Sequence, residues 1–104
     1  MGEMLDLVFD RQGRPIPVER WAELRRHYRY RQIALTILPD GRTVTTVWVG
    51  ISTGTTPPLI FETMIFIPPP KCEFEDGREQ YSTEAEALTG HEAIVQRGGF
   101  APDD

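Results

Sequence analysis

The sequence contains few residues of the types that build catalytic or metal centres. Among its 104 residues there are one cysteine and two histidines. A single cysteine excludes a disulfide bond within the chain. None of the spacings that mark a zinc site or a Ser–His–Asp triad occurs. We therefore expect no catalytic residue, no metal site and no cofactor, and the sequence predicts a protein that is not an enzyme.

Long hydrophobic runs and an excess of positive charge are also missing. No apolar stretch approaches the roughly 20 residues of a transmembrane helix. The first residues lack the basic and apolar segments of a signal peptide. The formal net charge is −5, whereas proteins that bind nucleic acid usually carry a basic patch. These absences predict a cytoplasmic protein without membrane contact, and they argue against nucleic-acid binding.

The charge that is present divides the chain into two parts. Residues 1–31 hold seven arginines against five acidic residues, whereas residues 32–104 hold four basic residues against eleven acidic ones. Ten of the eleven basic residues are arginine, whose planar guanidinium favours bidentate contacts to phosphate or carboxylate. The basic share gathers in the cluster Arg25, Arg26, Arg29 and Arg31.

Hydrophobic periodicity and turn signals predict the order of the elements. A short strand at residues 5–9 and a helix over 18–27 precede a strand over 28–38, in which apolar and polar residues alternate. The turn Pro39-Asp40-Gly41 leads into a second strand, residues 59–67 form a third, and residues 78–81 form a last short one. A capping box of Thr83 and Glu86 begins a C-terminal helix that Gly98 ends.

The turn also fixes how the first two long strands pair. It places Leu38 opposite Arg42, Ile33 opposite Val47, and Arg31 opposite Val49. Ile33, Leu35 and Ile37 then share one face, which this register marks as the apolar face, and Ala34 and Thr36 share the other.

These elements predict one α+β domain over residues 1–99 and a flexible tail at 100–104. We expect a small, mostly antiparallel sheet of three to five strands, with a short N-terminal helix and a C-terminal helix. The strand at 59–67 is apolar on both faces, so it is covered either from both sides within the chain or by a partner chain.

Three segments carry a resemblance to a known family: V-T-T-V-W-V-G (44–50), P-P-L-I-F-E-T-M-I-F (57–66) and Y-S-T-E-A-E-A-L-T-G-H (81–91). Together they resemble a family of small, uncharacterised proteins encoded by bacteriophages and prophages. Many members continue the first segment with Asp-His and a glycine-rich loop, whereas Ile51, Ser52 and Thr53 stand there in this chain. The resemblance implies a phage accessory protein in the cytoplasm of a bacterial host, directed at a host enzyme or a host defence.

Acidic residues crowd the segment from 73 to 92. Such a surface can imitate a phosphate backbone and occupy the nucleic-acid channel of a host protein. We therefore predict an inhibitor of a host protein or defence complex, such as a CRISPR effector. An ordinary solvated face is the competing interpretation. The predicted contact residues are Glu73, Glu75, Asp76, Glu79, Glu84 and Glu86, with Glu92 at the end of the segment.

A basic cluster, a tryptophan and a hydroxyl-rich loop support an alternative function. Arginines and backbone N–H groups bind phosphate, and an aromatic ring stacks on a base. This combination predicts a protein that sequesters a nucleotide second messenger. Its predicted ligand-binding residues are Arg29, Arg31, Trp48, Ser52, Thr53, Thr55 and Glu62.

Single polar residues in apolar surroundings complete the set of candidates. A carboxylate such as Glu62 needs a cation, an exposed edge or a pocket, and we expect Arg29 or Arg31 as its partner. His91 lies on the apolar stripe of the last helix, where a packed, hydrogen-bonded histidine is expected. Cys72 follows Lys71 with no base beside it.

A third function, a homodimeric structural or assembly protein that pairs through residues 59–67, stays open.

Overall fold

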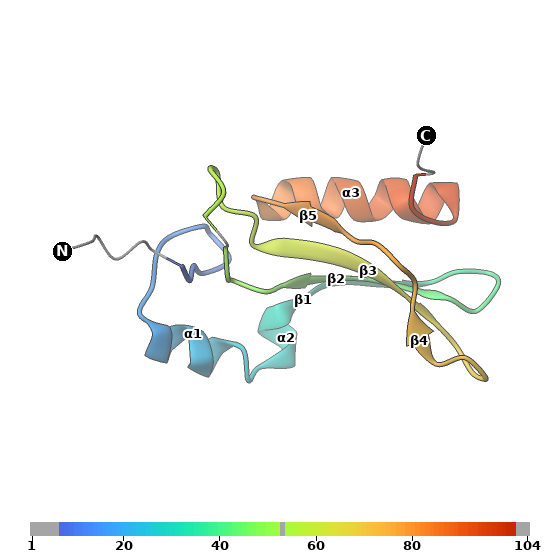
Figure 1. Ribbon diagram of the computed structural model, residues 1–104, viewed down its shortest axis with the longest axis horizontal. Helices are drawn as coiled ribbons and strands as arrows, with labels where there is room; N and C mark the ends of the chain where they lie inside the picture. The colour runs from blue at the N-terminus through green and yellow to red at the C-terminus, as the bar shows by residue number, and fades with distance from the viewer. Residues whose placement is uncertain (1–6, 53, 102–104) are drawn as a thin grey trace.

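The computed structural model describes residues 7–52 and 54–101. It confirms the predicted α+β class: an antiparallel sheet, two short N-terminal helices and a C-terminal helix (Figure 1). The beginning of the predicted strand at 5–9 and the end of the predicted tail lie outside the described residues. In chain order the elements are α1 (Val18–Leu24), α2 (Tyr28–Arg31), β1 (Gln32–Ile37), β2 (Thr43–Trp48), β3 (Phe61–Ile67), β4 (Glu73–Phe74), β5 (Glu79–Tyr81) and α3 (Glu84–Arg97).

The two borders of the sheet differ in length. β1 pairs with β2 and β2 with β3, all antiparallel. β4 and β5 both pair with β3, at its two ends. One border is therefore the six-residue β1, and the other consists of strands of only two and three residues.

The predicted register of β1 and β2 is confirmed near the turn and fails at the other end. The Leu38 amide donates to the Arg42 carbonyl at 2.7 Å, and Thr36 and Ala34 pair as expected. A β-bulge then inserts Ile33, so Gln32 and not Ile33 pairs with Val47. The bulge turns Ile33 into the hydrophobic core, which a regular strand would not do.

The predicted strand over 28–38 also begins too early. Residues Tyr28–Arg31 form the short helix α2, in which the amides of Tyr30 and Arg31 donate to the His27 carbonyl. The Tyr30 ring meets the Trp48 ring edge-on, with centroids 4.9 Å apart. This tertiary contact favours the helical turn over the extended chain that the alternating pattern indicated.

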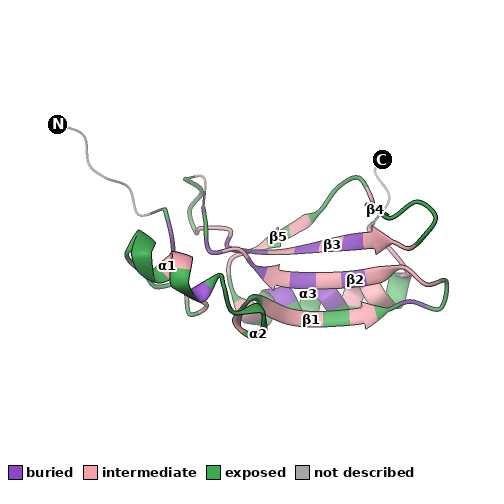
Figure 2. Ribbon diagram, turned by 90° about the horizontal axis from the view of Figure 1, so that it is seen from below, coloured by how far each residue is buried: buried purple, intermediate pink, exposed green. Residues whose placement is uncertain are grey.

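α3 covers one face of the sheet and no second layer covers the other (Figure 1). α1 and α2 lie on the uncovered side, but only at the end of the sheet where β1 begins (Figure 2). Burial alternates along β2 and β3, as expected for strands packed on one side. The fully buried positions of these strands are Val44, Thr46, Trp48, Phe61, Thr63 and Ile65.

Two apolar clusters form the core: one joins the sheet and α3 to the N-terminal segment and α1, and the other lies between α3 and the end of the sheet near the first turn. Phe100, which the sequence placed in a tail, is half-buried and packs against the second of them. The first cluster consists of Phe9, Leu24, Trp48, Ile60, Phe61 and Ala87, and the second of Leu38, Val44, Ile65 and Ile94.

The apolar face of β1 is not the face that meets the core. Leu35 and Ile37 are 54% and 67% exposed, while Thr36 faces α3 and hydrogen-bonds to it. The inner face is decided by the large buried side chains of β2 and β3, such as Trp48 and Phe61. β1 follows them because residues directly opposite each other in a sheet share a face.

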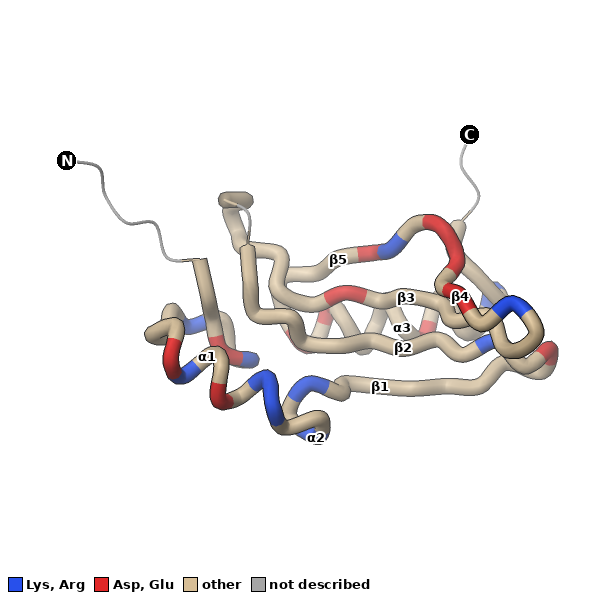
Figure 3. Tube along the Cα trace, turned by 60° about the horizontal axis from the view of Figure 1, so that its bottom comes forward, with Lys and Arg blue, Asp and Glu red and all other residues tan. Residues whose placement is uncertain are grey.

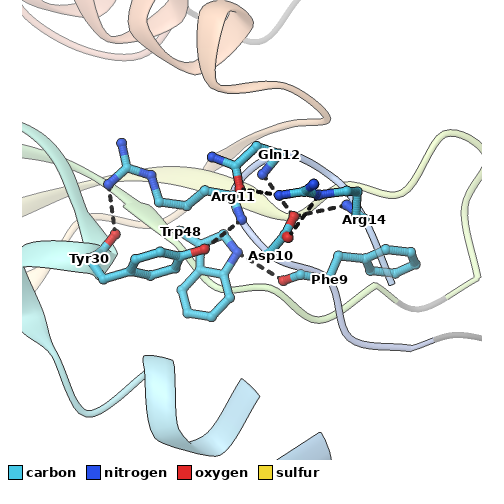
Figure 4. Close-up of polar contacts among 7 residues, drawn as sticks. All are labelled: Phe9, Asp10, Arg11, Gln12, Arg14, Tyr30 and Trp48. Carbon is cyan, nitrogen blue, oxygen red and sulfur yellow. Dashed lines mark hydrogen bonds and ion pairs between the residues drawn. The ribbon is translucent and has the colours of Figure 1, made fainter. Parts of the chain in front are cut away.

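The N-terminal segment is fastened to the sheet and to α3 by polar contacts. The Trp48 indole N–H donates to the Phe9 carbonyl at 3.1 Å, and the Arg11 amide donates to the Tyr30 hydroxyl at 2.9 Å (Figure 4). The Arg11 guanidinium also donates to both carboxylate oxygens of Glu84, at 2.9 and 2.6 Å. A bidentate pair of this kind fixes direction as well as distance.

The ends of α3 are the best-predicted local feature. Thr83 and Glu86 form the expected capping box, and Gly98 ends the helix in the left-handed conformation at φ 78°. Among the described residues, none of the helices combines the length and hydrophobicity that a membrane span requires.

Gly90 is the point of closest approach between α3 and β5. A Cβ atom built on it would lie 2.3 Å from Cε1 and 2.4 Å from the hydroxyl oxygen of Tyr81. The absent side chain therefore makes room for the Tyr81 ring, which packs against the first core cluster.

We expect Gly90→Ala to destabilise the protein, although alanine is the better helix former. Displacing Tyr81 should cost about 1–3 kcal/mol, against a helix-propensity gain of about 1 kcal/mol. Urea unfolding should therefore show a lower midpoint. Thr89→Ala, at the neighbouring exposed position, is the matched control and should leave stability equal or slightly higher. A stabilised Gly90→Ala protein would contradict the contact.

Candidate functional site

Most of the predicted acidic surface is occupied by contacts within the chain. Four of its six carboxylates have partners. Glu75 pairs with Arg42 at 2.6 Å, Glu79 with Arg97 at 3.5 Å, and Glu84 with Arg11 at 2.6 Å. Glu86 closes the capping box at the start of α3. The remaining two, Glu73 and Asp76, are exposed and have neither an ion pair nor a capping contact among the described residues.

The acidic residues also do not form one surface. Glu84 and Glu86 belong to the first turn of α3, whereas Glu73 and Asp76 lie at and after β4, near the far end of the sheet (Figure 3). The predicted phosphate mimic therefore reduces to a small acidic end of the sheet, which we call the acidic end and define as Glu73 and Asp76.

Arg42 is the centre of the charge network at this end of the molecule. Its guanidinium contacts Asp40 at 2.8 Å and Glu75 at 2.6 Å, and it donates to the Gly98 carbonyl at the end of α3. The hydrogen bonds that Arg42 donates to the carboxylates of Glu75 and Asp40 raise the pKa of Arg42 above its usual range. Hydrogen bonds from the Arg42 backbone and side chain lower the pKa of Asp40. The turn after β1 is thereby tied to both β4 and α3.

The residues predicted to hold a nucleotide are brought together only in part. Trp48 is 1% exposed and packs in the core, so its ring offers no face for stacking on a base. Ser52 is buried, and its hydroxyl lies 3.3 Å from that of Thr55. Thr53 lies outside the described residues. Arg29 is exposed, and Arg31 lines a hollow beside β2.

This hollow lies where α1 and α2 meet the uncovered side of the sheet. Its volume is about 260 Å³. Arg25 stacks over the Trp21 ring at 4.9 Å. Neither residue was among the predicted ligand contacts, although their spacing of four positions places them on one helix face. The residues that line the hollow are Trp21, Arg25, Arg31, Val47, Trp48, Val49 and Ile51.

Glu62 has a different partner from the predicted one. Its carboxylate lies 3.8 Å from the guanidinium of Arg78, not beside Arg29 or Arg31. The reason is that β5 and the residue before it lie next to β3, with Gln80 opposite Glu62. Glu62 is 13% exposed on the uncovered side of the sheet, so it places one negative charge within that face.

The uncovered side of the sheet has no second layer among the described residues. Large apolar residues stand on it in cross-strand rows. Leu35, Ile37 and Phe74 are each more than half exposed, and the Phe66 and Phe74 rings meet edge-on with centroids 5.4 Å apart. We call this surface the open face and define it as Leu35, Ile37, Thr43, Thr45, Val47, Glu62, Met64, Phe66 and Phe74.

The covered side contains a group of buried polar residues that the sequence did not reveal. His91 Nδ1 lies 2.7 Å from the Thr46 hydroxyl, and its Nε2 lies 2.9 Å from the Thr36 hydroxyl. Thr46 also contacts the Thr63 hydroxyl at 2.5 Å. The feature of the sequence that could have indicated this group is the presence of threonines at the inward positions of β2 and β3. His91 is hydrogen-bonded within the fold, as expected, and not aimed at a ligand.

The single cysteine lacks a reactive setting within the described residues. Cys72 is exposed and has φ 51°. No group of three or more metal-ligating side chains occurs in the part of the chain that the structure describes.

Comparison with known proteins gives this chain no relative: no family model, no curated protein and no solved structure matches it. The surfaces are therefore interpreted from their own chemistry.

The buried His91 predicts a loss of stability in weak acid. Burial lowers the pKa of His91 below its ordinary 6.5, and Glu92 opposes this only in part. The unfolded chain therefore takes up a proton near pH 6.5 that the folded chain resists, and stability falls as the pH drops below this value.

Urea unfolding between pH 8 and pH 5 measures this effect. His91→Gln should be less stable throughout but should lose less stability on acidification than the wild type. The exposed His27 provides the control, because His27→Gln should keep the wild-type pH dependence. Parallel pH profiles for the wild type and His91→Gln would show that His91 is not the responsible group.

Proposed function

We propose that the protein acts by binding another protein through the open face, as a phage-encoded accessory protein that inhibits a host protein or defence complex. The observation that carries the proposal is the exposure of Leu35, Ile37 and Phe74, each more than half accessible on a sheet face that lacks a second layer. The resemblance to phage proteins supports the setting. Contiguous apolar surface of this kind marks interaction sites in soluble proteins.

The composition of the open face suits a protein partner. Its middle carries Met64 and Phe66, residue types that are enriched at the centres of interfaces. Their β-strand backbone holds them in fixed positions, so little conformational entropy is lost on binding. The flanking Thr43 and Thr45 add small polar groups without charge.

Charges at the two ends of the open face indicate the chemistry of the partner. The acidic end, Glu73 and Asp76, lies at β4, and the arginine-rich segment 25–31, which contains α2, lies at the opposite end (Figure 3). A complementary partner presents an apolar patch with basic residues on the side that meets β4. Proteins that bind nucleic acid commonly carry such basic groups. We therefore still propose a host protein or defence complex as the target, but we place the contact surface on the open face of the sheet instead of on the acidic residues.

A photo-crosslinking experiment tests this proposal. p-Benzoylphenylalanine replaces Phe74 on the open face or, as a control, the exposed Thr89 of α3, in host cells during phage infection. We expect one host protein to be cross-linked at position 74 and not at position 89. Purified, that protein should be inhibited by the wild-type chain.

Substitutions then measure the contribution of each surface to binding of the captured protein. Phe74→Asp should weaken binding at least tenfold, about 1.4 kcal/mol, and Thr89→Asp should not. If Phe74→Asp binds normally while Glu73→Ala with Asp76→Ala abolishes binding, the acidic end and not the open face is the contact site.

A small anionic ligand is a second candidate, and the hollow beside α1 favours it. Arg25 and Arg31 both border a cavity of about 260 Å³ with an apolar floor. Ligand pockets usually exceed about 300 Å³, so the hollow suits a phosphate and one base of a nucleotide better than a whole dinucleotide.

Titration with a cyclic mononucleotide, followed by tryptophan fluorescence, tests this second function. Trp21 lines the hollow and should report binding. Arg31→Ala should weaken binding about tenfold or more, since a charge-assisted hydrogen bond contributes about 1.5–3 kcal/mol. Arg29→Ala is the control because Arg29 does not line the hollow. Equal effects of both changes would indicate general charge attraction only.

A further inference from the structure

The free border of β1 lacks the features that keep sheet edges from pairing. The strand Q-I-A-L-T-I is six residues long and contains neither a charged residue nor a proline. Its one irregularity is the bulge at Ile33, which lies at the α2 end. Exposed edges of natural sheets are usually protected by charges, prolines, bulges along the strand or very short strands.

The opposite border of the same sheet does carry this protection. β4 and β5 have only two and three residues. Charged residues stand on and around them: Lys71, Glu73, Glu75, Asp76, Arg78 and Glu79. The contrast within one molecule indicates that β1 is left open because another strand pairs with it.

The backbone shows which groups of β1 are free to pair. The Leu38 amide donates toward β2 at 2.7 Å. In an antiparallel sheet every second residue bonds to the same neighbour, so Thr36 and Ala34 also bond toward β2. The N–H and C=O groups of Leu35 and Ile37 therefore point away from the sheet, toward the open border.

We infer that β1 pairs with β1 of a second copy of this chain, antiparallel across a two-fold axis at Thr36. Leu35 of each copy then lies opposite Ile37 of the other. Each of these pairs exchanges two backbone hydrogen bonds, which uses all the outward groups of the regular part of β1. The two-fold symmetry pairs the β1 border of each copy with that of the other. No β1 border then stays free, so the assembly closes as a dimer.

Charge and exposed apolar surface near β1 agree with this pairing. In this pairing the start of β1 in one copy, next to α2, lies beside the turn at residues 39–41 of the other copy. Arg31 of the first copy therefore comes next to Asp40 of the second. Asp40 pairs with Arg42 of its own chain but is still exposed, and the described ion pairs do not include Arg31. The charges are therefore complementary between copies.

α3 presents an apolar side chain on the same flank. Gly90 faces Tyr81 of β5. Leu88 lies two positions earlier, about 200° around the helix, and so on the β1 side. Its side chain is 45% exposed, and a second copy paired at β1 brings its own α3 toward it on the same face of the joined sheet.

Light scattering tests the dimer directly. The wild-type chain should have a mass of about twice 11.9 kDa. Leu35→Lys, which adds the kind of charge that protects natural edges, should give single chains with an unchanged circular dichroism spectrum. Val18→Lys, at a position on α1 that is 61% exposed, is the control and should stay dimeric. A wild-type mass of one chain up to high concentration, or a dimer that Leu35→Lys leaves intact, would overturn the inference.

Disulfide trapping tests the position of the axis. The background is Cys72→Ser, which removes the single cysteine. Leu35→Cys and Ile37→Cys chains are mixed, allowed to exchange and oxidised with diamide. Directly opposite residues in such a pair have Cα atoms about 5.5 Å apart, which a disulfide spans. The mixture should cross-link, and each variant alone should not, because its own cysteines are displaced beyond about 7 Å. Cross-linking of Leu35→Cys alone, or none in the mixture, would overturn the pairing.

The experiments distinguish an error in the proposed dimer from an error in the proposed function. Leu35→Lys tests the border, whereas Phe74→Asp lies at the far side of the sheet and should leave the dimer mass unchanged. If the chain is dimeric but Phe74→Asp has no effect on target binding, the open face is not the contact site and the dimer stands.

Discussion

The hydrogen bonds of His91 to Thr46 and Thr36 determine how the rest of the structure is arranged. They join α3 to β2 and β1 at fixed positions, and Thr63 extends the group to β3. Apolar packing alone is non-directional, whereas buried polar groups must find specific partners. The group lies on the covered face together with two apolar clusters. The large apolar side chains such as Trp48 and Phe61 select the covered face, and the polar group fixes the position of α3 on it.

Two arginines hold the ends of this arrangement. Arg11 joins the N-terminal segment to the start of α3 through Glu84, and Arg42 joins the first hairpin to the end of α3 through the Gly98 carbonyl. Both side chains are partly buried, where such pairs are screened less than on the surface. Carboxylates that seem free for a partner in the sequence are thus part of the fold.

The surfaces without a partner among the described residues are one face of the sheet and the border formed by β1. Within the described part of the chain, the open face lacks a second layer and β1 has β2 on one side but no strand on the other, while the opposite border is short and charged. Pairing of two copies at β1 would join their open faces into one apolar surface twice as wide. A partner protein would then meet a broad, rigid sheet with the acidic ends at its two outer sides.

The sequence by itself determined the local features. The turn before Arg42, the capping box at Thr83 and the antiparallel α+β class depend on short-range backbone preferences, and these were predicted correctly. The tertiary structure alone decided which face of β1 is covered, that Trp48 is buried, and that Glu62 pairs with Arg78. Each depends on which strand lies beside which and on where α3 packs. Alternation along a strand separates two faces, but it contains no information on which of them another element will cover.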